Sequence, residues 1–226
     1  MQPHNFWQSF DAEADAPPYR ERFPARMPDG RVLHLPIRAW GDGQEGIASL
    51  ILTQASFSVE TALADALAEA LKDTGAEVLV GMPTLGLPLA RAVAERLGHS
   101  RYVALGTSRK FWYEGQLSVP LSSITSPDAT KRLYLDPRMR PLLAGRIALI
   151  DDVISSGRSI CAGIALLRQA GVTPVALGAA MLQTRKSLPP LQDLGLDPAL
   201  RFVFETPLLR RTPSGWQADQ DCPPHR

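Results

Sequence analysis

The sequence has little cysteine and no excess of charge of either sign. Its 226 residues include two cysteines, Cys161 and Cys222, which form neither a metal-binding spacing nor a disulfide framework. We therefore expect a reduced, cytoplasmic protein. Lys plus Arg number 24 and Asp plus Glu number 23, so the net charge of +1 argues against a nucleic-acid partner.

Long apolar runs are also absent. No segment approaches the ~18–20 apolar residues of a membrane span, so we expect no membrane partner. Residues 1–10 lack a basic region followed by an apolar stretch, so no signal peptide is expected. Apolar residues make up 45% of the chain and charged residues 21%, as in globular proteins that bury a full core without disulfides or a structural metal.

Proline is abundant and unevenly placed. Of the 20 prolines, six lie in residues 1–36, eight lie in 174–224, and none lies in 142–173. Because proline interrupts helices and central strands, we expect regular structure in the middle of the chain and irregular ends. Residues 1–30 are therefore assigned to an irregular segment and residues 207–226 to a disordered tail.

The middle of the chain alternates strand and helix patterns. The expected strands span 31–39, 47–54, 76–80, 101–105, 146–150, 173–182 and 201–206, and the expected helices span 57–73, 87–97 and 158–170. The first two strands form a candidate hairpin, and Pro36 places the first of them at a sheet edge. Ser58 is the expected N-cap of the first helix, and Gly75 ends it. The repeated strand–loop–helix order predicts parallel strands.

The strongest chemical pattern lies in residues 147–159. A buried strand ends on two adjacent carboxylates, Asp151 and Asp152, and a Ser- and Gly-rich turn then opens a helix. Ligands of parallel sheets bind at the carboxyl ends of the strands, and helix N-termini bind anions. A phosphorylated sugar fits both features, with hydroxyls near the acids and phosphate near the amides. The alternatives are a chance strand-to-helix turn and an acidic pair that binds Mg²⁺ in another α/β enzyme.

This segment resembles the phosphoribosyl-pyrophosphate signature of the type I phosphoribosyltransferases. That signature has apolar residues, an acidic pair, two apolar residues and small hydroxylic residues around a glycine. Ala148 is small for its place, and Arg158 stands where many members have Gly or Thr. The resemblance covers about 76–182. It implies an α/β fold with a five-stranded, mainly parallel sheet, helices on both faces, and a small hood, which we place in 31–56 and 183–206.

The resemblance assigns roles to the acidic pair and to the turn. Asp151 and Asp152 would accept hydrogen bonds from the ribose hydroxyls, and their charge would favour an oxocarbenium-like transition state. Asp152 would also contact Mg²⁺, directly or through water, with the ion carried on the diphosphate. The 5′-phosphate would be held by Ser155, Ser156, Gly157, Arg158 and Ser159.

A second segment with an implied role follows the strand 76–80. In the family, a short loop at this place binds pyrophosphate through backbone N–H groups, often with an unusual peptide geometry. The loop here is Pro83, Thr84, Leu85 and Gly86. The alternative is an ordinary turn between a strand and a helix.

The third segment to which the resemblance assigns a role begins with the basic pair Arg109 and Lys110. Adenine phosphoribosyltransferases have an Arg-Lys pair here, at the start of a flexible loop that closes over the site. Both cations would meet the pyrophosphate, with Lys110 in a catalytic role, and the alternative is two solvated charges. Residues 106–140 hold six basic and three acidic residues, which suits closure over a polyanion.

Two features leave alternatives open. The cluster 111–113, Phe-Trp-Tyr, either stacks on a base or pins the loop against the body or a partner subunit, and we favour pinning. After the strand 173–182, Gln183 either contacts a base edge or is a solvated loop residue.

The resemblance predicts an enzyme, a homodimer with one phosphoribosyltransferase-like domain over 31–206. It would use Mg²⁺ and transfer the phosphoribosyl group of 5-phosphoribosyl 1-pyrophosphate (PRPP) to a nitrogenous base. The Arg-Lys pair favours a purine, adenine above all, although residues 117–135 lack the usual adenine-enzyme pattern of a Tyr followed by a Leu-Glu-Tyr-Gly run. The alternatives are a non-enzymatic PRPP-sensing regulator and a transferase for a pyrimidine or another acceptor.

Overall fold

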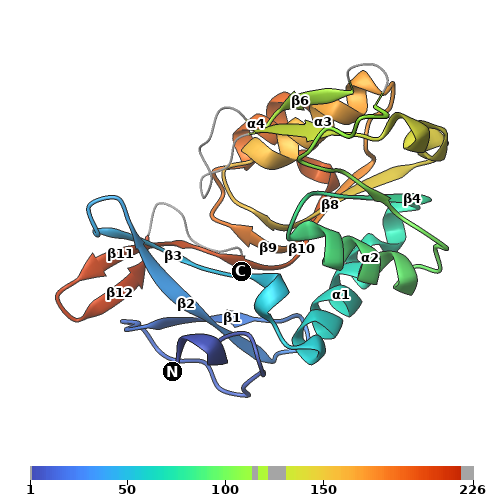
Figure 1. Cartoon of the computed structure of the whole chain (residues 1–226). Helices are drawn as coiled ribbons and strands as arrows, with labels where there is room; N and C mark the ends of the chain where they lie inside the picture. Colours follow the sequence, from blue (N-terminus) through green and yellow to red (C-terminus); the bar gives the residue numbers. More distant parts are fainter. Residues whose placement is uncertain (1, 114–116, 122–130, 220–226) are drawn as a thin grey trace.

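The computed structural model describes residues 2–113, 117–121 and 131–219. Its centre is a five-stranded sheet in which every neighbouring pair of strands is parallel (Figure 1). The strands, in spatial order, are β10 (Leu200–Thr206), β9 (Ala176–Gln183), β8 (Ile147–Ile154), β4 (Val78–Gly81) and β5 (Val103–Ala104). The expected five-stranded parallel sheet is therefore confirmed.

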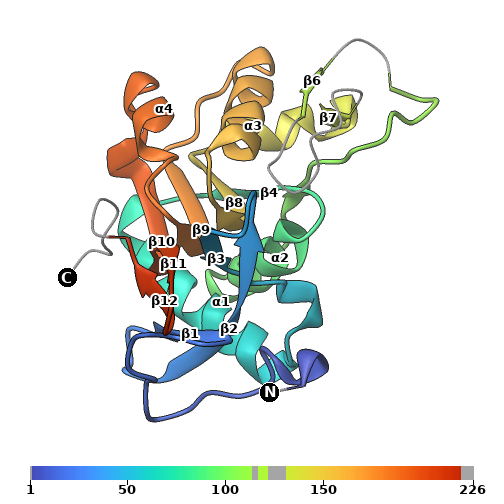
Figure 2. The ribbon, with the colours of Figure 1, turned by 90° about the vertical axis from the view of Figure 1, so that its left-hand side faces the viewer.

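Helices cover both faces of this central sheet (Figure 2). They are α1 (Phe57–Leu71), α2 (Gly86–Arg96), α3 (Arg158–Gln169) and α4 (Leu188–Asp193). Successive side chains of a strand point to opposite faces, and β8 shows the consequence. Ala148 and Ile150 pack in the core shared with α1 and α2, whereas Leu149 packs in the core shared with α3 and α4.

The start of α1 differs from the sequence prediction. Ser56 is the N-cap, because its backbone is extended and its side chain accepts a hydrogen bond from the Val59 N–H at 3.3 Å. The predicted cap, Ser58, lies inside the first turn of the helix. The predicted end is confirmed: Gly75 has a φ of 60°, the left-handed conformation that glycine adopts at little cost.

A second sheet, the hood, is antiparallel and combines both ends of the chain (Figure 1). Its strands, in spatial order, are β1 (Arg22–Arg26), β2 (Val32–Trp40), β3 (Glu45–Ala48), β11 (Leu208–Thr212) and β12 (Gly215–Ala218). The β2–β3 hairpin was predicted. The irregular assignment of 1–30 is wrong for Arg22–Arg26, which form β1, and the disordered assignment of the tail is wrong for the residues of β11 and β12. Placing 183–206 in the hood was also wrong, since β10 belongs to the central sheet. Residues 220–226, with Cys222, lie outside the described residues.

Proline placement explains why the ends were misassigned. Proline cannot donate a ladder hydrogen bond, but it is compatible with an edge strand, and β1, which contains Pro24, is at the edge of the hood. Strand β2 is not an edge strand, contrary to expectation. Pro36 pairs with Arg22 at the end of the β1 ladder, and the β3 ladder begins at Ile37, so Pro36 stands where β2 changes partner.

Residues 106–136, between β5 and β8, are called the lid here, after the closing loop that the resemblance implies. The described part of this segment contains an antiparallel pair, β6 (Ser118–Pro120) and β7 (Arg132–Tyr134), where the sequence patterns predict neither a strand nor a helix. Residues 114–116 and 122–130 lie outside the described residues. The 3₁₀ segments among the described residues are Pro3–Asn5, Leu52–Gln54, Lys72–Thr74, Pro137–Ala144 and Asp197–Ala199. Over the described ranges, no helix combines the length and the apolar character that crossing a membrane requires.

Candidate active site

A cavity of about 360 Å³ lies at the carboxyl ends of β4, β8 and β9, between the hood and the N-terminus of α3. It brings together three groups of predicted site residues, namely the acidic pair, the turn 155–159 and the loop 83–85. The parallel topology explains this, because the carboxyl ends of neighbouring strands meet at one edge of a sheet. Residues far apart in the sequence therefore share one cavity wall.

The acidic pair is buried in the last half of β8. Asp151 and Asp152 are each 7% exposed, and the Asp151 Oδ1 accepts a hydrogen bond from the Asp152 N–H at 2.9 Å. Burial, and then repulsion from Asp152, raises the pKa of Asp151 well above its usual value, and burial raises the pKa of Asp152 to about 6. Neither carboxylate forms an ion pair within the described part of the chain. The pair therefore favours a ligand that brings hydroxyl donors or positive charge.

The first residue of α2 lies against this pair. A Cβ atom on Gly86 would stand 2.8 Å from the Asp151 Cα and 2.9 Å from its Oδ1. Real Cβ atoms do not approach other atoms so closely, and the obstacle is backbone, which cannot swing aside. Glycine at this position therefore allows α2 to begin directly beside the acidic pair.

The loop before α2 is tied to β8 at its start. The Met82 N–H donates to the Ile150 carbonyl at 2.8 Å, and the peptide bond between Pro83 and Thr84 is cis. Pro83, Thr84 and Leu85 line the cavity next to the acidic pair. This is the place in which the sequence predicts a pyrophosphate-binding loop.

The turn after β8 continues the lining of the cavity. All of residues 155–159 line the cavity, and α3 begins at Arg158, so the first N–H groups of a 12-residue helix are close to it. Gly157 has a φ of 83°, and a Cβ atom there would be 3.2 Å from the Ser187 Cα. Glycine is thus required both by conformation and by close packing. Helix N-termini of this kind bind phosphate.

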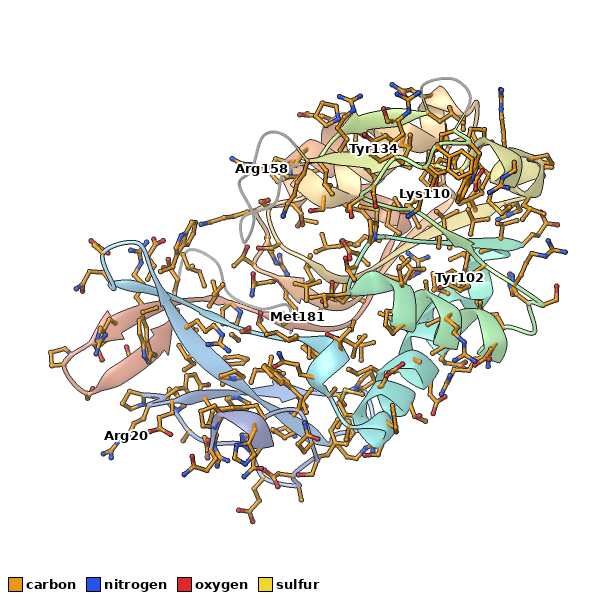
Figure 3. All side chains as sticks on the ribbon, in the orientation of Figure 1. Arg20, Tyr102, Lys110, Tyr134, Arg158 and Met181 are labelled. Carbon is orange, nitrogen blue, oxygen red and sulfur yellow. The ribbon has the colours of Figure 1, made fainter. Side chains whose placement is uncertain are left out.

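Arg109 and Lys110 do not line this cavity. Arg109 borders a separate cavity of about 340 Å³ next to the β6–β7 pair, and Lys110 is exposed and lies well apart from Arg158 (Figure 3). Two other cations line the main cavity, Lys131 of the lid and Arg158 of α3. The role of Arg109 and Lys110 at the pyrophosphate stays a prediction that needs the lid to move.

The aromatic cluster of the lid packs mainly against the lid itself. The Trp112 Nε1 donates to the Asp136 carboxylate at 3.3 Å, and the Arg138 guanidinium lies 4.9 Å from a Trp112 ring centroid. Hydrogen bonding from Arg138 lowers the pKa of Asp136 to about 2. Phe111 is 97% exposed, and neither it nor its neighbours Trp112 and Tyr113 line the main cavity. The described contacts of Trp112 lie within the lid and at Arg138 directly after it, so the choice between pinning and base stacking stays a prediction.

Several cavity residues gave no chemical signal in the sequence. They are Ile47, Ser49, Leu50, Thr107, Leu121, Lys131 and Met181. The three from 47–50 belong to the second strand of the predicted hairpin, which the resemblance places in the hood. Met181 belongs to β9, on the side of the central sheet near the hood (Figure 3). Gln183 also lines the cavity, and it is buried rather than solvated.

The fold and the site together define a class of protein. A parallel sheet carries a buried acidic pair at its ligand edge, and an anion-binding helix N-terminus faces the same cavity. Carboxylates that accept hydrogen bonds from hydroxyl groups and amides that bind phosphate are the two requirements of a phosphorylated sugar. The class is therefore an α/β protein that binds a sugar phosphate.

Comparison with known proteins gives the family. A model of the phosphoribosyl transferase domain matches residues 53–194, which is more than half of the chain. The chain is 34% identical over 147 residues to an adenine phosphoribosyltransferase of Frankia alni, covering 63% of this chain and 70% of that one. This chain belongs to the type I phosphoribosyltransferase family, an enzyme family of pentosyl-transferring glycosyltransferases.

Two further similarities add to this assignment. The chain is 35% identical over 121 residues to the transcriptional regulator GfcR of Halobacterium salinarum, covering 52% of this chain and 51% of the regulator. The crystal structure of APRTase from Giardia lamblia complexed with 9-deazaadenine matches with a TM-score of 0.54 and 22% identity, covering 69% of this chain and 83% of that one. At that identity the match shows the shared fold alone.

Proposed function

We propose that this protein transfers the phosphoribosyl group of PRPP to a purine base, adenine above all, and releases pyrophosphate. The observation that carries the proposal is the single cavity shared by the buried acidic pair and the α3 N-terminus. In this proposal, the turn 155–159 holds the 5′-phosphate, the loop 83–86 holds the pyrophosphate, and Asp151 and Asp152 accept hydrogen bonds from the ribose hydroxyls.

The electrostatics of the acidic pair suit this chemistry. As the bond between C1 and pyrophosphate breaks, positive charge develops on the ribose ring. Two carboxylates in a low-dielectric cavity stabilise that charge more than they stabilise the neutral ground state, which lowers the barrier. Burial raises the pKa of both carboxyl groups, so negative charge is costly in this cavity, and hydroxyl donors or developing positive charge offset that cost.

The same residues fit Mg²⁺ as the cofactor. Mg²⁺ prefers oxygen ligands, keeps several waters, and is bound through one or two carboxylates together with substrate phosphates. The described residues contain no cluster of three or more acidic, His or Cys side chains that could hold a metal ion. In the proposal, the ion is carried on the diphosphate. Asp152 is the residue that we propose contacts the ion, directly or through water. When bound, Mg²⁺ would neutralise charge on the leaving pyrophosphate.

The choice of a purine rests on the relatives and on the lid. Adenine phosphoribosyltransferases from Frankia alni and Corynebacterium kroppenstedtii match at 34% and 33% identity. The Arg109–Lys110 pair after β5 is the further feature in common with adenine enzymes. Because neither side chain lines the cavity, the proposal requires the lid to close before both cations meet the pyrophosphate.

A pyrophosphate-release screen with PRPP, Mg²⁺ and a panel of bases tests the proposal. We expect release with adenine, and an Asp152→Asn variant should lose at least ~100-fold of that rate, the order expected for one preorganised electrostatic contact. Asp193→Asn, an exposed carboxylate on α4, is the matched control and should keep the full rate. If no base in the panel causes pyrophosphate release, or if Asp152→Asn keeps full activity, the proposal is contradicted.

A second candidate is a regulator that binds PRPP without transferring it. The similarity to GfcR favours it, although the chain spans about half the length of that regulator. Under this alternative, PRPP and Mg²⁺ bind to the cavity, but no base in the panel releases pyrophosphate. A measurement of PRPP binding, together with the pyrophosphate-release screen, therefore separates the enzyme from the sensor.

A further inference from the structure

The wall of the cavity formed by the hood and β9 is mainly apolar, and its polar residues are Ser49 and Gln183. Ile47 and Leu50 come from the hood side, and Met181 and Gln183 from the end of β9. A heteroaromatic base has two apolar faces and a polar edge, so it needs apolar contacts and a few placed polar groups. The side-chain amide of Gln183 is placed to meet such an edge.

The orientation of this amide is fixed by the hood. The Gln183 Nε2 donates to the Ala48 carbonyl at 2.6 Å, and the residue is 7% exposed. A flipped amide would place its oxygen against that carbonyl oxygen, which is repulsive, so one orientation is favoured. With the NH₂ group engaged, the oxygen Oε1 is the atom that Gln183 can present to a ligand, and it accepts hydrogen bonds only.

The backbone around Gln183 is held in place on both sides. Gln183 is the last residue of β9 and pairs with Thr206 of β10. The next residue, Thr184, has a φ of 60°, and its N–H donates to the Thr206 carbonyl at 2.8 Å. A β-branched residue rarely adopts a positive φ, and such conformations persist where the surroundings over-determine them, often at functional sites. The chain thus bends sharply at the point where the amide faces the cavity.

We infer that Gln183 determines acceptor specificity by accepting a hydrogen bond from an exocyclic amino group, which selects adenine over 6-oxopurines. The inference rests on the proposed function and adds the residue and the atom that make the choice. A 6-oxopurine would place an oxygen against Oε1 and leave a buried acceptor unpaired. The expected discrimination is about 10–100-fold, the range for an unsatisfied buried polar group.

Equilibrium binding of nucleotides to the full chain tests this inference without requiring turnover. Titration calorimetry would measure Kd for AMP, for IMP, and for purine riboside 5′-monophosphate, which lacks the amino group. The wild type should bind AMP about 10–100-fold more tightly than either of the others. In Gln183→Met, which keeps the length of the side chain and removes the acceptor, the three affinities should converge to within about 3-fold.

A second variant distinguishes the effect of losing the amide oxygen from the effect of weakening the hood. The Trp7 Nε1 donates to the Ser49 carbonyl at 3.0 Å, next to the carbonyl held by Gln183, but Trp7 does not line the cavity. Trp7→Phe therefore weakens the same stretch of hood and leaves Oε1 in place. It should keep the wild-type preference for AMP.

Three results would overturn the inference. They are equal wild-type affinity for AMP and the nucleotide lacking the amino group, an unchanged AMP preference in Gln183→Met, and equal loss of that preference in Trp7→Phe. The first uses the wild type alone, so it decides the matter even if Gln183→Met does not fold. A wild type that prefers AMP through Gln183 but releases no pyrophosphate would overturn the proposed enzyme while keeping the inference.

Discussion

The contact between Gly86 and Asp151 gives the sharpest structural prediction. In Gly86→Ala, the new methyl group would stand 2.8 Å from the Asp151 Cα, and an ordinary contact of 3.4 Å requires a retreat of about 0.6 Å. Asp151 is the residue that moves, or α2 moves away from it. Overpacking of this kind costs about 1–3 kcal/mol of folding stability, and the better helix propensity of Ala returns at most about 1 kcal/mol.

The functional loss should exceed what the stability loss explains. Displacing a catalytic group by up to about 1 Å reduces turnover by about 10–100-fold, because positioning is lost while the chemistry of the group is kept. The assays are urea unfolding, PRPP affinity by calorimetry, and pyrophosphate release with adenine. Gly46→Ala is the matched control, since its Cβ would stand 2.8 Å from the Trp216 ring in the hood.

We expect Gly46→Ala to lose stability without losing PRPP affinity. Gly86→Ala should lose both folding stability and PRPP affinity. Its loss of PRPP affinity should be measurable at a temperature where the variant is fully folded. A folded Gly86→Ala that binds PRPP and releases pyrophosphate within about 2-fold of the wild type would refute the argument that this glycine keeps the acidic pair in place.

Three further predictions concern the pair, the helix cap and the hood. Burial raises the pKa of Asp152 to about 6, above its unfolded value of 3.8, so its contribution to stability is present below pH 4 and lost as the pH rises through 6. Asp152→Asn should therefore stabilise the ligand-free protein by about 1–3 kcal/mol at pH 8 and by less at pH 5. Urea unfolding measures this gain, and an equal gain in the free energy of unfolding at the two pH values would refute the prediction. Ser56→Ala should lower the free energy of unfolding by about 1 kcal/mol, whereas Ser58→Ala should change it little. The reverse order of the two losses in thermal unfolding would show that Ser58 is the N-cap. Ending the chain after Thr206 removes β11 and β12, including the buried Trp216, and should lower Tm or cause aggregation; an unchanged Tm would show that these strands are dispensable.

The central sheet was predictable because its signals are local. Apolar residues at spacings of three and four predict helix 57–73, and Gly75 ends it by adopting the left-handed conformation. The location of the acidic pair followed from topology, since a parallel order brings the carboxyl ends of β4 and β8 together. The cap was missed by two residues, because Ser56 and Ser58 are both good caps and the choice depends on backbone conformation.

The β2–β3 hairpin of the hood was predicted, but the other hood strands were not, because they depend on pairing between distant segments. Strand β11 pairs with β3, although Leu208 and Ile47 are far apart in the sequence. Proline made both ends look irregular, and the burial of Trp216 against the hood has no local signature. The position of Gln183 likewise depends on a hydrogen bond across to Ala48, which no pattern near residue 183 encodes.

The most direct test of the whole account is titration calorimetry of PRPP with Mg²⁺ into the wild type and into the double variant Asp151→Asn, Asp152→Asn. The account predicts a single site in the wild type and a loss of affinity of at least about 100-fold in the double variant, because both carboxylates accept hydrogen bonds from the ribose. Wild-type protein that does not bind PRPP, or a double variant that binds it equally well, would contradict the assignment of this cavity to PRPP.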